Sequence, residues 1–406
     1  MTARQGPYDS AYSWARLGVS LAVAAVASVG MWSVVLVLPH VQAEFGVGRG
    51  DVSLAYVATM IGYGAGNLLI GRAVDRVGIT WALVAAAAAL TLGYVLAGLA
   101  GSVASFALAQ GLLVGTGAAA GFGPLMADIS HWFRRRRGIA VAIAASGNYL
   151  AGAIWPLVLR PWLETGDWRG AYFFVAVVCA IAIVPLAMLL RRRMPPEQMA
   201  AGAGPQAGPV RSIDVGPRAL TLVLALAGVA CCVAMSMPQV HIVAYCVDLG
   251  YGAVAGAEML ALMLGAGVAS RLAFGLLADR IGGVLTLLIG SALQGTALAL
   301  YLPFDGLAAL YVVSLLFGLS QGGIVPAYAI IVREYLPAEE AGARIGFVIM
   351  ATIAGMALGG WMSGAIFDAT GSYGMAFLNG ILWNALNIVI VLVLLGRTRK
   401  PRVVAA

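Results

Sequence analysis

Charged residues are scarce in this chain of 406 residues. Lysine, arginine, aspartate and glutamate together make up 10% of it, whereas 62% is hydrophobic and the mean hydropathy is +0.94. A soluble domain needs roughly 25–35% charged residues on its surface. The shortage of charge therefore excludes a soluble globular protein and indicates one that lies in a membrane.

Patterns that bind metals or build a catalytic centre are also missing. The four cysteines have no CxxC spacing, so neither a disulfide framework nor a metal site is expected. No HExxH motif and no cluster of aspartate and glutamate lies within the apolar runs, although a membrane enzyme needs such groups. We therefore expect no cofactor, no metal and no enzymatic activity.

Long apolar runs make up most of the chain. A helix needs about 17–25 mostly apolar residues to cross a bilayer. Twelve runs have about this length: 17–38, 53–70, 80–100, 105–127, 138–159, 170–190, 219–245, 254–275, 283–302, 307–332, 345–367 and 374–396. The sequence therefore predicts an all-α membrane protein with twelve transmembrane helices.

The net charge of +7 raises the possibility of nucleic-acid binding, but the placement of the cations argues for topology instead. If the N-terminus lies inside, most lysines and arginines fall on that side, including the run Arg134–Arg137. Only Arg49, Arg160 and Arg169 fall on the other side. Because cytoplasmic loops are enriched in lysine and arginine, we expect a multi-pass protein of the cell membrane with both termini in the cytoplasm and no nucleic-acid partner.

The chain is also predicted to consist of two similar halves. GRAVDRVG at 71–78 and GLLADRIG at 275–282 are offset by 204 residues and follow the second and eighth runs. A polar stretch rich in arginine, proline and glycine separates the sixth run from the seventh. We expect a six-helix bundle at 1–190, a cytoplasmic linker at 191–218, and a second bundle at 219–406 that ends in a short basic tail. Such repeats are expected to enclose a central polar cavity. Glycine-rich faces such as GYGAG and GMALGGWMSG predict close helix packing.

These features resemble a known family. GRAVDRVG fits the G-x-x-x-D-R-x-G signature of the major facilitator superfamily, and the second copy and twelve runs agree with it. HWFRRRRGIAVAIAASGNYLAGAIWP, VHIVAYCVDLGY, RLAFGLLADRIG and FGLSQGGIVPAYAIIVREYLP are similar to the branch of monocarboxylate transporters and oxalate:formate antiporters. The resemblance implies a secondary transporter, and we expect it to function as a monomer.

Arg271 is the candidate substrate-binding residue. Apart from Glu258, it is the only charged residue within the twelve runs as drawn here. A charge at membrane depth costs at least about 2.5–3.5 kcal/mol, so it usually faces a polar cavity or a partner. Arginine presents a planar fork that matches a carboxylate. The alternative is that the guanidinium of Arg271 serves no substrate, and either extends to the cytoplasmic face or pairs with another helix.

The repeat and the family resemblance both bear on this site. Shifting Arg271 by the repeat offset places Asn67 at the equivalent position in the first half. In the family, an arginine at this place implies substrate binding, and animal members carry an aspartate four residues earlier. Here that position is Gly267, which puts the family's proton coupling in doubt. Asn148, Tyr149 and Tyr328 are further candidates for substrate contact.

Two titratable residues are candidates for carrying a proton. His241 and Glu258 lie at similar depth on either side of the turn near 249–250. A histidine beside a carboxylate in a low-dielectric environment can titrate in the physiological range. A structural polar pair is the alternative interpretation.

The two copies of the repeated motif are predicted to act as a conformational latch. They contribute Arg72, Asp75 and Arg76 in the first half, and Asp279 and Arg280 in the second. A carboxylate at this place can bind the N-terminus of a neighbouring helix, and the resemblance implies that the contact breaks during opening. Asp128 is expected to pair with this arginine cluster.

The sequence as a whole predicts alternating-access transport of a small organic anion. A monocarboxylate such as lactate or pyruvate, moved with a proton, is the favoured substrate, because a proton cancels the charge that an inside-negative membrane opposes. Exchange of anions such as oxalate and formate, and export of larger amphiphilic compounds, are the alternatives.

Overall fold

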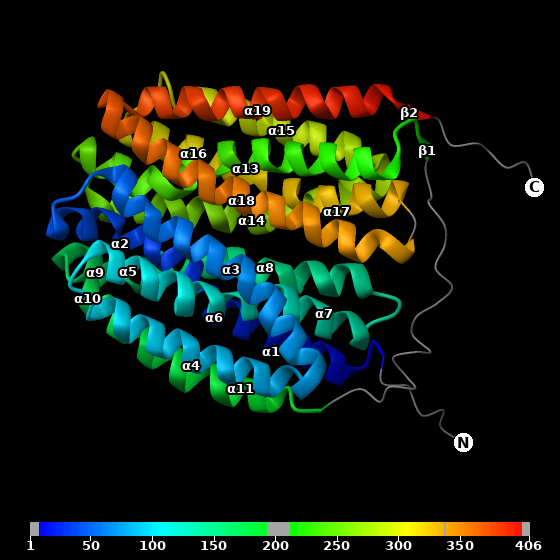
Figure 1. Cartoon of the computed structure of the whole chain (residues 1–406), viewed down its shortest axis with the longest axis horizontal. Helices are drawn as coiled ribbons and strands as arrows, with labels where there is room; N and C mark the ends of the chain where they lie inside the picture. Colours follow the sequence, from blue (N-terminus) through cyan, green and yellow to red (C-terminus); the bar gives the residue numbers. More distant parts are fainter. Residues whose placement is uncertain (1–7, 193–211, 337, 400–406) are drawn as a thin grey trace, which may run out of the picture. The chain divides into compact units, whose positions relative to one another are not determined.

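The computed structural model describes residues 8–192, 212–336 and 338–399, which are mainly helical (Figure 1). Twelve helical stretches among them are long and apolar enough to cross a membrane, which confirms the number of spans predicted from the sequence. The first six consist of α1 (Ala11–Ala27), α2 (Val29–Phe45), α3 (Arg49–Val77), α4 (Ile79–Gly98), α5 (Val103–Ala109), η1 (Gln110–Gly115), α6 (Thr116–Ala118), η2 (Ala119–Gly121), α7 (Gly123–Trp132), α8 (Arg137–Val158), α10 (Trp168–Val178), η3 (Cys179–Ile183) and α11 (Val184–Leu189), with α9 (Arg160–Thr165) between two of them.

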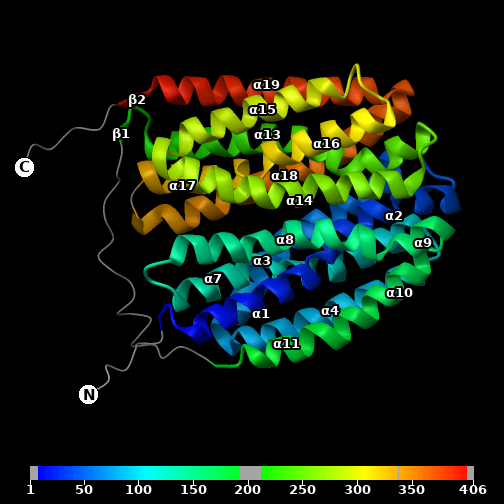
Figure 2. The same ribbon diagram turned by 180° about the vertical axis from the view of Figure 1, so that it is seen from behind.

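The other six spans begin after the residues of the predicted linker. They consist of α13 (Pro217–Asp248), α14 (Gly252–Ile281), α15 (Gly283–Leu300), α16 (Leu307–Gln321), α17 (Ile324–Tyr335), α18 (Ala338–Thr370) and α19 (Tyr373–Gly396). Figure 2 shows α15 and α19, which pack against each other. Residues 193–211 of the predicted linker and 400–406 of the predicted basic tail lie outside the described residues. Between them, β1 (Ser212–Ile213) pairs antiparallel with β2 (Thr398–Arg399).

The described residues pack into two compact units. One contains the first six spans together with residues 241–265, and the other contains residues 212–240 and 266–399. The boundaries therefore cut α13 and α14 partway along their lengths. The end of α13 and the beginning of α14 pack with the first six spans, a division that differs from the repeat boundary at 191–218.

Helices within each unit approach one another closely through glycine. A Cβ atom added to Gly62 in α3 would lie 1.8 Å from the carbonyl oxygen of Gly111 in η1. In the other unit, a Cβ atom on Gly359 in α18 would lie 2.4 Å from the carbonyl oxygen of Val233 in α13. Both distances are too short for any side chain, so these glycines allow the backbone contact that small residues make in membranes.

Several spans are interrupted. A turn at Ser28 separates α1 from α2 in the first span, the fourth and sixth contain the π-helical stretches η1 and η3, and the tenth breaks at Gly322–Gly323. Interruptions of this kind release backbone N–H and C=O groups from the helical ladder, and inside a membrane these need other partners. The break in the tenth span receives such partners from α14, as described below.

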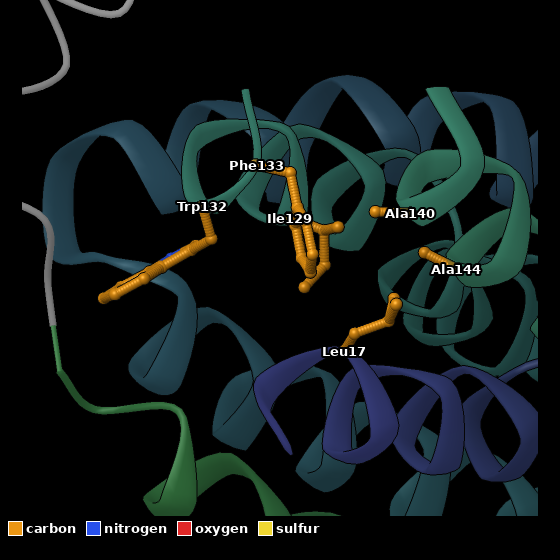
Figure 3. Close-up of a cluster of buried hydrophobic side chains, with 6 residues drawn as sticks. All are labelled: Leu17, Ile129, Trp132, Phe133, Ala140 and Ala144. Carbon is orange, nitrogen blue, oxygen red and sulfur yellow. The ribbon is translucent and has the colours of Figure 1, made fainter. Parts of the chain in front are cut away.

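An apolar cluster joins α1, α7 and α8 within the first unit. Figure 3 shows its six buried members: Leu17, Ile129, Trp132, Phe133, Ala140 and Ala144. The first helix extends back to Ala11, with Ser10 as its N-cap, and so begins earlier than the predicted run at 17–38. Arg16 therefore lies inside the first helical stretch, whereas it falls just outside the predicted runs, within which Arg271 and Glu258 were the charged residues considered.

Candidate substrate site

Arg271 lies in α14 beside the break between α16 and α17. Its Nε atom donates a hydrogen bond to the backbone carbonyl oxygen of Gly322 over 3.2 Å. The backbone N–H of Gly322 in turn donates to the hydroxyl oxygen of Ser270, also over 3.2 Å. Arg271 is only 8% exposed, and the backbone carbonyl of Gly322 at the break holds its guanidinium inside this unit.

The contact between α14 and the break allows no side chain at position 322. A Cβ atom on Gly322 would lie 2.3 Å from the carbonyl oxygen of Gly267 and 2.6 Å from the backbone nitrogen of Arg271. Gly267 is the position at which the family resemblance implies an aspartate. The backbone of α14 therefore approaches the tenth span closely next to the arginine, and this approach fixes the base of its side chain.

Two buried glutamines form a hydrogen-bonded pair next to the break in the tenth span. Gln321 is the last residue of α16, and its Oε1 atom accepts a hydrogen bond from Nε2 of Gln239 in α13. The two residues are 0% and 1% exposed. The remaining amide atoms, Oε1 of Gln239 and Nε2 of Gln321, have no hydrogen-bond partner among the described residues. Both glutamines are polar residues within predicted apolar runs, although they were not chosen there as substrate contacts.

A pattern that the search for catalytic motifs in the sequence overlooked lies at residues 318–322, which read G-L-S-Q-G and have the GxSxG spacing of a hydrolase nucleophile. In hydrolases this motif forms a sharp turn from a strand to a helix that exposes the serine. Here the serine is part of α16, and the hydroxyl of Ser320 donates to the carbonyl oxygen of Phe317 in the same helix. The residue is 1% exposed, so it serves helix packing.

Tyr328 belongs to the same unit as Arg271, but its hydroxyl is bound elsewhere. It donates to Oδ1 of Asn387 in α19 over 3.0 Å, and Asn387 donates to the hydroxyl of Ser291 in α15 over 2.7 Å. This chain of hydrogen bonds links α17 to α15 and α19. The structure thus gives Tyr328 a bridging position between helices.

The other three candidate contacts, Asn67, Asn148 and Tyr149, belong to the first unit. The single N–H of Trp32 Nε1 donates a bifurcated hydrogen bond to Asn148 in α8, to its backbone oxygen over 3.0 Å and to its Oδ1 over 2.8 Å. Asn67 in α3 donates to the carbonyl oxygen of Tyr63, one turn earlier, over 2.9 Å. Tyr149 is 7% exposed. The polar atoms of Asn148 and Asn67 therefore contribute to packing within their own unit.

The proton-carrying candidates both lie in residues 241–265. His241 in α13 is 2% exposed. Glu258 in α14 forms an ion pair with Nη1 of Arg160 over 2.9 Å, and Arg160 also contacts Glu164 over 2.7 Å. The structure therefore gives Glu258 an arginine partner, which sequence analysis did not foresee because Arg160 is far away in the chain.

The latch candidates are mostly exposed at helix ends. Arg72, Asp75 and Arg76 lie at the end of α3, and Asp279 and Arg280 lie at the end of α14; all five are exposed.

The sixth latch candidate, Asp128 in α7, has a different partner from the one expected. It binds Arg16 of α1, with 2.8 Å between Nε and Oδ2, and this contact corrects the expected pairing with the arginine cluster.

Comparison with known proteins identifies a matching family model and several relatives in sequence. A family model described as the Major Facilitator Superfamily matches residues 20–307 and 252–406. Monocarboxylate transporter 13 of Bos taurus is 30% identical over 290 residues, which cover 71% of this chain and 67% of that protein. The Rattus norvegicus protein of the same name is 29% identical, and the matched part covers 66% of it. Monocarboxylate transporter 11 of Mus musculus is 27% identical over 385 residues, which cover 92% of this chain and 85% of that protein.

Solved structures with the same fold are more distant in sequence. A bacterial homolog of the human lysosomal transporter Spinster, in an inward-facing and occupied conformation, superposes with a TM-score of 0.74 at 12% identity, covering 97% of this chain and 100% of the other. The nucleoside transporter NupG gives a TM-score of 0.69 at 12% identity, covering 94% and 99%. At this level of identity the likeness concerns the fold alone.

Proposed function

Because the chain belongs to the Major Facilitator Superfamily, we propose that it is a secondary active transporter that carries a small monocarboxylate, such as lactate or pyruvate, across the cell membrane by alternating access. Two relatives that carry the name monocarboxylate transporter support this substrate class.

The observation that carries the proposal is the position of Arg271. It is a permanent positive charge in a membrane span, 8% exposed, and its Nε atom is held by a backbone carbonyl at a helix break. A guanidinium matches a carboxylate through two parallel charge-assisted hydrogen bonds. Anchoring one edge of the group by Gly322 orients its plane in advance, which lowers the entropy lost when an anion binds.

The excess of arginine and lysine on one side of the predicted spans supports an orientation with both termini in the cytoplasm. In this orientation Asp75 and Asp279, with their neighbouring arginines, act at the cytoplasmic ends of the helices as the conformational latch. The chain functions as a monomer, because each six-helix repeat has its counterpart within the same chain.

We further propose that transport is coupled to protons, with His241 and Glu258 as the candidate carriers. Moving one charge against the membrane potential costs about 2.3 kcal/mol per 100 mV, and a proton cancels this cost for a monovalent anion. Anion exchange is the second candidate mechanism. It is favoured by the ion pair between Glu258 and Arg160, because this pair already engages one of the two candidate proton carriers.

The substrate-binding role is tested by uptake into proteoliposomes with the variants Arg271→Lys and Arg271→Gln. We expect both to lose most lactate uptake, because lysine lacks the planar fork and glutamine lacks the charge. Arg218→Gln is the matched control, since Arg218 is exposed at the beginning of α13. Wild-type affinity and rate in the Arg271 variants would contradict the proposal.

Counterflow separates symport from exchange. Proteoliposomes are loaded with unlabelled lactate or left empty, and uptake of labelled lactate is followed with and without an inward proton gradient. Symport predicts uptake into empty vesicles that the gradient stimulates. Uptake that ignores the gradient and requires trapped internal anion would establish exchange instead.

A further inference from the structure

We propose that the amide pair Gln239–Gln321 selects substrates with a hydroxyl next to the carboxylate, so that the transported anion is a 2-hydroxy acid. This inference rests on the proposed function of Arg271 and narrows its substrate class. It is carried by two buried amide atoms that lack hydrogen-bond partners in the part of the chain that the structure describes, next to the helix break that positions the arginine.

The unsatisfied atoms require a physical explanation. Oε1 of Gln239 and Nε2 of Gln321 lie in side chains that are 1% and 0% exposed, and neither has a hydrogen-bond partner among the described residues. A buried polar atom without a partner costs free energy comparable to a lost hydrogen bond, and such atoms are rare in native structures. Two of them on one hydrogen-bonded pair indicate a site that another polar group fills during the transport cycle.

The conclusion does not depend on how the amides are oriented. As placed, Gln239 donates to Gln321, which leaves one acceptor on Gln239 and one donor on Gln321. If both amides are rotated, the direction of the bond reverses, and one donor and one acceptor are again left over. In either orientation the pair offers a third group one donor and one acceptor.

The backbone places this pair close to the arginine. Gln321 directly precedes Gly322, whose carbonyl oxygen binds Nε of Arg271. Consecutive Cα atoms are about 3.8 Å apart, so Gln321 lies one residue from the carbonyl that anchors the arginine. The glutamine side chain then reaches Gln239 of α13 in the same unit.

A 2-hydroxy acid fits this arrangement in both of its functional groups. Its carboxylate binds the guanidinium of Arg271. Its hydroxyl is both a donor and an acceptor, so it satisfies the free carbonyl oxygen and the free N–H of the amide pair together. A 2-oxo acid offers only an acceptor, and an unsubstituted acid offers neither. The expected order of transport efficiency is therefore lactate, then pyruvate, then propionate.

The amide pair is tested by replacing both members. The double variant Gln239→Leu/Gln321→Leu removes the two amides together, which avoids leaving one of them buried alone. Initial uptake of lactate and propionate gives a ratio of kcat/KM for the two acids. We expect this ratio to fall about tenfold in the double variant, in keeping with the loss of one substrate hydrogen bond, while propionate uptake is retained. Gln294→Leu is the matched control, because Gln294 is also buried but its amide is bonded to the carbonyl oxygen of Cys231.

A second measurement uses the wild-type protein and does not depend on folding of the variant. Glycolate and acetate differ only in the hydroxyl, and we expect glycolate to inhibit lactate uptake about tenfold more strongly. Equal inhibition by the two acids, or an unchanged lactate-to-propionate ratio in the double variant, would overturn the inference. Wild-type protein that moves none of these acids would instead contradict the proposed function.

Discussion

Arg16 and Asp128 form a buried two-point ion pair that joins α1 to α7. The distances are 2.8 Å from Nε to Oδ2 and 2.9 Å from Nη2 to Oδ1, and the side chains are 1% and 14% exposed. The same guanidinium donates to the carbonyl oxygen of Leu190 just after α11 and lies over the ring of Trp132 at 4.7 Å. One cation thus ties three spans of the first unit together.

Removing one partner of this pair should destabilise the protein strongly. Asp128→Asn leaves the charge of Arg16 buried without its anion, a change that typically costs about 3–5 kcal/mol. We expect a clearly lower midpoint of thermal unfolding in detergent. Asp75→Asn, at an exposed position, should leave the midpoint unchanged. An Asp128→Asn midpoint equal to that of the wild type would show that the pair does not contribute to stability.

The helices could be predicted well because a membrane leaves the backbone few choices. A spanning segment must satisfy its own N–H and C=O groups, so an apolar run of sufficient length forms a helix. Helix ends were harder to place. Arg16 was missed because the first run was drawn from residue 17, whereas the helix begins six residues earlier at Ala11 with Ser10 as its cap.

The candidate site could be predicted only in part, because its geometry depends on contacts between distant segments. Arg271 stands out in the sequence as a charge in an apolar run. Gly322–Gly323 does not stand out among 53 glycines, although its carbonyl holds the arginine. Gln239 and Gln321 are 82 residues apart, and nothing in either sequence neighbourhood indicates that they bond to each other.

The close approach at Gly322 predicts that even one methyl group there impairs transport. In Gly322→Ala the new Cβ atom would lie 2.3 Å from the carbonyl oxygen of Gly267, so the tenth span must move away from α14. We expect lactate uptake to fall at least tenfold, because displacing a positioning group by about 1 Å can cost a hundredfold in rate. Gly275→Ala in α14, where nothing lies within 4 Å of the added atom, is the control and should transport normally. Equal uptake by the two variants would contradict the positioning role of the break.

A second ion pair predicts a measurable local opening. Arg49 at the beginning of α3 binds Asp248 at the end of α13, with distances of 2.5 and 2.7 Å to its two carboxylate oxygens. Cys246, two residues before Asp248, is 0% exposed. We expect Asp248→Asn to increase the rate of Cys246 modification by a maleimide about fivefold, because a partly exposed pair is worth about 1 kcal/mol.

Peptide mass spectrometry measures this rate in the otherwise native chain. Cys179 in η3 belongs to the same unit and is also 0% exposed, so it reports any general loosening. Faster modification of Cys246 with an unchanged rate at Cys179 is the expected outcome. A parallel increase at both cysteines would mean that the variant loosens the whole unit and that the Arg49–Asp248 ion pair does not act locally.

The N-terminal segment should detach from the first unit only at strongly acidic pH. The carboxylate of Asp9 accepts hydrogen bonds from three consecutive backbone N–H groups, those of Arg134, Arg135 and Arg136, over 3.1 to 3.2 Å. Burial alone would raise the pKa of Asp9, but these bonds and the charge of Arg135 lower it below the usual range for aspartate. The stabilisation is therefore present above the pKa of the unfolded chain, about 3.9, and is lost as the pH falls through the lowered value. Pepsin cleavage at Tyr8 and Tyr12, followed between pH 5 and pH 2, measures this detachment. In the wild type we expect cleavage to accelerate only below about pH 3.9. Asp9→Asn should be cleaved readily at every pH in this range. A wild-type transition above pH 5 would show that another group holds the segment in place.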